Sequence, residues 1–333
     1  MQVLRKLLFP ISLIYGLIVF LRNRLFDVGI FSSRQFATKT ICVGNLSVGG
    51  TGKTPMIELL VRSLSGTYTS AILSRGYKRK SAGFLLATEN TSVEDLGDEP
   101  FQLKTKFSNV AVAVDADRRN GIQQLENIIK PDVILLDDAF QHRKVKPDFS
   151  ILLTAYDNLY IDDWYLPTGN LRDAKGEAKR AQIIVVTKCP SEISKQEQAT
   201  IAAKMNLAPD KKLLFSYLRY NTDLKGTEMS LEALKSKKVT LVTGIANPEP
   251  LERFLTSAGL TFEHLKFKDH HFFTDQEIED LKSKECILTT EKDYVRLQTK
   301  IAQLHYIEVK HEFLEHGKEV LEAALHQFMT KTS

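Results

Sequence analysis

The stretch GNLSVGGTGKTP, residues 44–55, constrains the fold of this chain more than any other. Phosphate-binding P-loops follow the pattern G-x-x-x-x-G-K-[ST], and residues 47–54 match it except that Ser47 replaces the first glycine. Residues 40–43 are β-branched or apolar and predict a buried strand, while residues 56–64 carry apolar side chains at helical spacing. Strand, glycine-rich loop and helix in this order predict a nucleotide site, and an ordinary glycine-rich turn is the alternative.

The residue types in this loop suit a bound triphosphate. Glycines let backbone N–H groups approach phosphate oxygens without clashes from a Cβ, and the helix N-terminus adds a partial positive charge. Lys53 is expected to reach the β- and γ-phosphates, and the Thr54 hydroxyl to ligate Mg²⁺. The predicted nucleotide-binding residues are Ser47, Val48, Gly49, Gly50, Thr51, Gly52, Lys53 and Thr54. The run Val186–Cys189 lacks the Asn and Asp of the guanine-selecting N-K-x-D motif, so ATP is the expected nucleotide.

The N-terminus combines basic and apolar residues. Residues 7–21 carry no charge and would form a helix about 22 Å long, shorter than the ~30 Å hydrocarbon core of a bilayer. Six basic residues and one aspartate lie within residues 1–40. A signal peptide fits poorly because no A-x-A-like cleavage site follows the apolar run. A buried core helix is a further alternative, and we expect a membrane-embedded or interfacial anchor whose flanking cations favour the cytoplasmic side.

Apolar strands alternate with helical patterns along the rest of the chain, which predicts a mainly parallel sheet with helices on both faces. The pattern restarts near residue 213 and predicts a smaller C-terminal α/β unit. Its expected strands are 213–217, 239–243, 262–267, 286–289 and 305–309. We therefore expect a membrane-associated helical segment at 1–36, a P-loop catalytic domain at 37–212 and a smaller domain at 213–333, with a ligand cleft between the two domains.

Several polar clusters are candidates for chemistry. The buried strand 133–136 ends in Asp137 and Asp138, as expected of carboxylates that hold Mg²⁺ beside a P-loop, and either one is a candidate ligand. In Gly97–Pro100, helix capping by Asp98 is an alternative to a chemical role. The sequence Asp269-His270-His271 suits proton transfer or a surface turn. The stretch 164–173 predicts either a loop over the active site, with Arg172 on phosphate, or plain packing around Trp164.

Together these motifs resemble those of the tetraacyldisaccharide 4′-kinases, also called lipid A 4′-kinases. The resemblance covers nearly the whole chain and rests on VGNLSVGGTGKTP, SRGY, GDEP, LLDDAFQH, LPTGNLRD, VTK, GIANPE, DHHFF and TTEKDYVR, in that order. It implies a P-loop kinase that uses ATP and Mg²⁺ to phosphorylate the 4′-hydroxyl of a tetraacylated, 1-phosphorylated glucosamine disaccharide, forming lipid IVA. It also implies a place on the cytoplasmic face of a bacterial inner membrane, in contact with membrane lipid. We expect no nucleic-acid partner.

The resemblance also implies roles for single residues. Asp98 is the expected base, assisted by His270, and Lys53 is the third catalytic residue. The expected metal ligands are Thr54, Asp137, Asp138 and Glu99. The expected substrate contacts are Arg75, Arg119 and Arg172. Asp173 departs from the family, which usually has Glu there, so its carboxylate would reach one methylene less far.

Two other functions compete with this interpretation. A membrane-associated, nucleotide-driven switch or ATPase is disfavoured because Val48 replaces the extra lysine of the K-G-G-x-G-K-T loop found in nucleotide-driven dimers. A P-loop kinase for a soluble sugar or nucleoside is disfavoured by the basic, apolar N-terminus.

Overall fold

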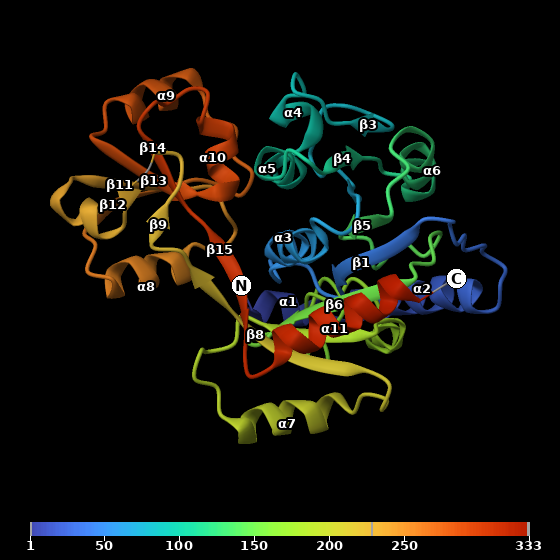
Figure 1. Cartoon of the computed structure of the whole chain (residues 1–333). Helices are drawn as coiled ribbons and strands as arrows, with labels where there is room; N and C mark the ends of the chain where they lie inside the picture. The colour runs from blue at the N-terminus through green and yellow to red at the C-terminus, as the bar shows by residue number, and fades with distance from the viewer. Residues whose placement is uncertain (1, 228, 332–333) are drawn as a thin grey trace.

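The computed structural model of the chain describes residues 2–227 and 229–331. Figure 1 shows a larger unit that holds both the chain's early strands and its C-terminal helix, a smaller unit beside it, and a helical N-terminal segment. That segment consists of α1 (Gln2–Leu7) and α2 (Phe9–Asp27).

The larger unit is built on a nine-stranded sheet in the order β15-β8-β7-β6-β1-β5-β2-β4-β3. Seven neighbouring strands in the middle pair in parallel, and only β15 and β3 at the two edges run antiparallel to their neighbours among the described residues. The strands are β1 (Lys39–Asn45), β2 (Ser70–Ser74), β3 (Leu85–Leu86), β4 (Ala111–Val114), β5 (Val133–Asp137), β6 (Phe149–Ala155), β7 (Ile183–Thr187), β8 (Lys212–Tyr220) and β15 (Val309–Phe313). The predicted fold class is confirmed.

Helices cover both faces of this sheet, and each face has its own apolar core. On one face, α3 (Lys53–Leu64), α5 (Asp98–Lys106) and α11 (Gly317–Thr330) pack against strand residues such as Ile41 and Ile151. On the other face, α6 (Arg118–Ile128), α7 (Lys195–Met205) and the 3₁₀ helix η1 (Lys175–Arg180) contribute to the second core. The short helix α4 (Val93–Leu96) precedes α5. Parallel strands buried on both sides need this double cover, and β5 and β6 are buried along their whole length.

The smaller unit has a four-stranded parallel sheet in the order β12-β11-β13-β14. Its strands are β11 (Val239–Thr243), β12 (Phe262–Lys266), β13 (Cys286–Thr290) and β14 (Leu304–Ile307). A small hairpin of β9 (Asp223–Leu224) and β10 (Met229–Ser230) precedes them. The helices are η2 (Glu232–Ser236), α8 (Glu249–Ser257), α9 (Asp275–Lys282) and α10 (Glu291–Leu297).

The strand predicted at 305–309 is present as β14, but it ends at Ile307, because the chain then leaves the smaller sheet and enters the larger sheet at β15. Two strands of the expected C-terminal domain, β8 and β15, pair with each other in the larger sheet, and α11 packs in its core. We propose that the smaller unit comprises about residues 221–308, as an insertion between β8 and β15, rather than 213–333.

Candidate active site

The P-loop connects β1 to α3 at the carboxyl edge of the larger sheet. Gly49 and Gly52 have φ of +113° and +83°, a region that only glycine adopts readily, and Gly52 is the N-cap of α3. Val48, Gly49 and Gly50 are exposed, so their backbone is accessible to a ligand. Ser47 is buried and its hydroxyl donates to Asp163 at 3.2 Å, so the side chain that replaces the usual glycine points into the protein, away from the loop's open side.

A cavity lies beside the loop and reaches the smaller unit. Residues 47–51 line it together with Asn158 and Lys188 of the larger unit and Asn247 of the smaller one. The ligand cleft expected between the two units therefore exists at the P-loop.

Asp138 lies between two cations next to the P-loop. Lys53 Nζ is 3.8 Å from Asp138 Oδ1, and Arg172 Nη1 donates to Asp138 Oδ2 at 3.2 Å. Arg172 also donates to the Asn45 side chain at 2.6 Å, which ties the 164–173 loop to the end of β1. Burial alone would raise the pKa of Asp138, but Lys53 and Arg172 outweigh it and hold this pKa below its usual value.

Asp137, the last residue of β5, is a buried carboxylate with spare bonding capacity. Oδ2 accepts a hydrogen bond from Ser74 at 3.0 Å, while none of the described residues donates to Oδ1. Burial and the nearby charges of Asp138 and Glu99 raise its pKa to about 6. A buried carboxylate oxygen without a donor suits a hard cation such as Mg²⁺, and the charge of Lys53 in the P-loop acts on this carboxylate.

A second cluster brings together residues of both units. Asp98, at the start of α5, is 2 % exposed and lies 2.6 Å from Nδ1 of His270, which belongs to the smaller unit. Arg296 of α10 forms a two-pronged pair with the same carboxylate, through Nε to Oδ1 at 2.6 Å and Nη2 to Oδ2 at 2.7 Å. The capping alternative for Asp98 is wrong, since Gly97 occupies the N-cap position.

The tautomer of His270 follows from its other neighbour. Lys292 Nζ lies 3.1 Å from Nε2, and an ammonium group can only donate, so Nε2 is the acceptor. The hydrogen is therefore on Nδ1 and points at Asp98. Burial would raise the pKa of Asp98, but the hydrogen bonds from His270 and Arg296 outweigh this and lower it.

Glu99 lies between the two clusters. It is 3.3 Å from Lys292, and its charge contributes to the raised pKa of Asp137. Asp98, Glu99 and His270 are close enough to share an ion, but Arg296 and Lys292 already neutralise the two carboxylates. This favours Asp137 over the Asp98 cluster as the metal position.

The three arginines expected at the substrate differ in their surroundings. Arg172 is at the P-loop, as described. Arg75 follows β2 and is exposed, while Arg119 pairs with Asp117 at 3.1 Å at the start of α6. Its neighbour Arg118 is the buried one and donates to the carbonyl of Asp137 at 3.3 Å. For Arg75 and Arg119, substrate contact stays a prediction.

Sequence reasoning assigned no role to Lys292 and Arg296. Both belong to the quoted run TTEKDYVR and lie four residues apart on α10, so they share one helix face. That spacing is a signal, but it does not reveal that the face meets Asp98.

Asp173 binds the N-terminal helix and not the phosphate site. It accepts from Asn23 at 2.7 Å and pairs with Arg22 at 3.2 Å, and it is fully buried. Further along α2, Ser12 bonds to Thr168 at 2.8 Å and Tyr15 donates to the carbonyl of Arg172 at 3.1 Å. The loop that carries Arg172 therefore lies between α2 and the P-loop.

A model of the tetraacyldisaccharide-1-P 4′-kinase family matches residues 4–330. The chain belongs to this family. It is 52 % identical over 324 residues to a tetraacyldisaccharide 4′-kinase of Flavobacterium johnsoniae, covering 95 % of each chain. It is 45 % identical to the enzyme of that name from Bacteroides thetaiotaomicron, covering 88 % of this chain and 83 % of the other. The resemblance inferred from the motifs is confirmed.

A solved structure is also similar over the full length. LpxK from Aquifex aeolicus, in complex with ATP, superposes with a TM-score of 0.80 at 30 % identity, covering 98 % of this chain and 99 % of that one. The predicted enzyme class, a kinase of lipid A biosynthesis, is thereby confirmed.

Proposed function

We propose that this tetraacyldisaccharide 4′-kinase transfers the γ-phosphate of ATP to the 4′-hydroxyl of its acylated disaccharide 1-phosphate, with Asp98 as the base. The observation that carries the proposal is the Asp98–His270–Arg296 cluster, which joins residues of both units next to Glu99, whose charge acts on Asp137. In this proposal the acylated disaccharide binds between the units, with its 4′-hydroxyl at Asp98 and the triphosphate of ATP at the P-loop amides.

Asp98 is suited to accept the proton that the attacking hydroxyl loses. An ionised carboxylate has about four acceptor positions, and the hydrogen bonds from Arg296 and His270 fill three of them. One position is left for the hydroxyl. Arg296 keeps the group charged, and Lys292 fixes the His270 tautomer that orients it. General-base help of this kind contributes roughly 10²–10⁴-fold in rate.

Most of the remaining acceleration would come from positioning and charge. Lys53 faces Asp138 in the present structure and is within reach of a phosphate bound in the loop. A bound Mg²⁺, held by Asp137 and the Thr54 hydroxyl, would neutralise charge that builds up on the transferred phosphoryl group. Asp138 would hold Lys53 in position beside the phosphates, and its contact with Arg172 would keep the 164–173 loop next to the P-loop.

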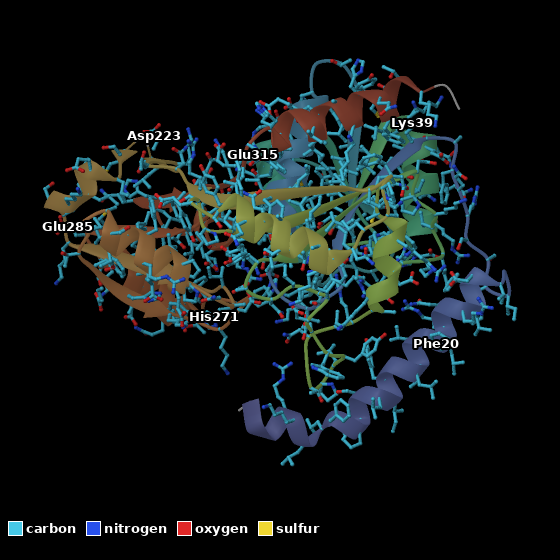
Figure 2. All side chains as sticks on the ribbon, turned by 90° about the horizontal axis from the view of Figure 1, so that it is seen from below. Phe20, Lys39, Asp223, His271, Glu285 and Glu315 are labelled. Atoms are coloured by element: carbon cyan, nitrogen blue, oxygen red, sulfur yellow. The ribbon has the colours of Figure 1, made fainter. Side chains whose placement is uncertain are left out.

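We further propose that α2 lies in the membrane interface on the cytoplasmic side. One face of the helix, including Ser12, Gly16 and Asn23, is buried against the protein. The other face is apolar and exposed, and Figure 2 shows α2 along one side of the molecule with Phe20 on it. The exposed apolar residues of this face are Phe9, Ile11, Leu13, Ile14, Leu17, Ile18, Phe20 and Leu21, and Leu7 at the end of α1 is exposed as well. A helix that is bound to protein along one side and apolar on the other suits an interface better than a lone span.

The test is a product assay with mass measurement of the lipid. Purified protein is incubated with ATP, Mg²⁺ and the acylated disaccharide 1-phosphate, and the lipid should gain one phosphoryl group at the 4′-position. ATP consumption without a phosphorylated lipid would instead support a nucleotide-driven switch or ATPase.

A further inference from the structure

Two buried side chains donate hydrogen bonds to backbone carbonyls of the P-loop. His311, on the edge strand β15, has its Nε2 atom 2.9 Å from the carbonyl oxygen of Gly52. Thr187, the last residue of β7, donates its hydroxyl to the carbonyl of Thr51 at 2.9 Å. His311 is 5 % exposed and Thr187 is fully buried.

The hydrogen-bond roles of His311 are determined by its neighbours. A carbonyl oxygen only accepts, so Nε2 carries the hydrogen and donates to Gly52. Nδ1 then accepts from the hydroxyl of Ser216 on β8, at 3.0 Å. Burial lowers the pKa of His311 to about 4, so the ring is neutral at physiological pH, as this arrangement requires.

The ring packs directly on the Gly52 backbone. A Cβ at position 52 would lie 2.8 Å from Nε2, so glycine is needed there for space as well as for its positive φ. The Gly52 carbonyl also accepts from the Met56 amide at 3.1 Å, which begins the hydrogen-bond ladder of α3. The helix offers no equivalent donor to the Thr51 carbonyl, because residue 55 is proline, and Thr187 provides one.

The hydrogen bonds that orient the Thr51 and Gly52 carbonyls also orient the backbone amides of Gly52 and Lys53. A trans peptide is planar, so its N–H points opposite to its C=O. The Thr51 carbonyl shares a peptide group with the Gly52 amide, and the Gly52 carbonyl shares one with the Lys53 amide. Donors on the carbonyl side therefore direct these two N–H groups away from His311 and Thr187 and polarise them.

We propose that His311 and Thr187 are positioning residues of the phosphate cradle, which hold the Gly52 and Lys53 amides in the orientation that binds the phosphates of ATP. This inference rests on the proposed function, since it assigns those amides to ATP. Neither residue touches the nucleotide itself, and both act through the backbone.

The test compares ATP affinity in matched variants. His311→Leu removes the donor, whereas His311→Gln keeps an N–H at a similar distance from the backbone. His305→Leu is the control, because His305 is equally buried at 4 % exposed and bonds to Thr227, but lies in the smaller unit. The dissociation constant for ATP with Mg²⁺ is measured at equilibrium without acceptor, together with the melting temperature of each variant.

We expect His311→Leu to weaken ATP binding about tenfold, as for a lost hydrogen bond next to a charged ligand, and His311→Gln to restore most of it. His305→Leu should bind ATP like the parent even if it melts earlier. Equal affinity of parent and folded His311→Leu, or equal losses in the Leu and Gln variants, would overturn the assignment.

If His311→Leu does not fold, Thr187→Val gives the same test, because it removes one hydroxyl and keeps the side-chain shape. It should weaken ATP binding by a similar factor, and unchanged binding would overturn the proposal. A parent protein that does not bind ATP at all would overturn the proposed function and this inference with it. Normal parent binding with unaffected variants would overturn only the inference.

Discussion

Asp98 shows how much of a residue's role depends on tertiary contacts. In the sequence its four-residue motif fits helix capping, and only the family resemblance pointed to a base. In the structure the carboxylate is buried and bound by His270 and Arg296, which lie more than 170 positions later in the chain. The P-loop, in contrast, could be predicted because strand, loop and helix are contiguous and every part of the motif is local.

The pH dependence of turnover should show how strongly Arg296 lowers the pKa of Asp98. Asp98 acts as a base only when ionised, and its lowered pKa extends activity to lower pH. Arg296→Gln removes the charged donor, so the pKa of Asp98 should rise and the acid limb of the kcat profile should move up by about one pH unit or more. The control is Arg253→Gln, which changes an exposed arginine on α8. An acid limb at the same pH in both variants would show that Arg296 does not tune the base.

The ionised carboxylate of Asp137 should lower the stability of the metal-free protein and should be stabilised by bound Mg²⁺. Its native pKa of about 6 exceeds the usual unfolded value of about 3.9, so ionising Asp137 destabilises the folded protein, and this cost is fully present above about pH 6. Without metal at pH 8, Asp137→Asn should therefore melt at the same temperature as the parent or higher, and the difference should vanish towards pH 4.

Added Mg²⁺ should raise the melting temperature of the parent but not of Asp137→Asn, as thermal unfolding followed by calorimetry would show. A variant that melts earlier than the parent at pH 8 and keeps the full Mg²⁺ response would place the metal elsewhere.

At the scale of elements, α2 has two different faces. Its protein-facing side makes polar contacts with the 164–173 loop, including Asn23 to Asp173, while its outer side is apolar. The sequence predicted an anchor from the charge-free run and its basic flanks. It could not predict the polar contacts, because serine, tyrosine and asparagine within a largely apolar helix do not reveal their partners.

Membrane association should depend on the outer face of α2. Replacing Leu13, Leu17 and Phe20 by serine removes three exposed apolar side chains, each worth about 1.5–3 kcal/mol on burial, so binding to vesicles should fall a hundredfold or more. Co-sedimentation with anionic phospholipid vesicles measures this. Ile128→Ser, which changes a comparably exposed residue on α6, should bind like the parent. Undiminished sedimentation of the triple variant would mean that another surface docks.

At the scale of the whole molecule, the insertion of the smaller unit between β8 and β15 brings the active site together. Lys106, at the end of α5, lies within 2.8 Å of three carboxylates, which are Glu58 of α3, Glu291 of α10 and Glu308 between the two sheets. One half-buried ammonium group thus joins the P-loop helix, the Asp98 helix and the smaller unit. This arrangement holds α10, with Lys292 and Arg296, against Asp98.

The architecture was predictable from alternating strands and helices, but the division between the units was not. The chain around Glu308 is apolar on both sides, so β14 and β15 look like one strand although they belong to different sheets. This crossing brings His311 on β15 to the backbone of Gly52. Sequence periodicity carries no information about which sheet a strand joins.

The most direct test of the central claim is turnover of Asp98→Ala, measured as phosphorylated lipid formed, alongside equilibrium binding of ATP. If Asp98 is the base, kcat should fall about a hundredfold or more while the dissociation constant for ATP stays within about twofold. Near-normal turnover would contradict a base at this position. A loss confined to ATP affinity would instead make Asp98 a nucleotide or metal contact.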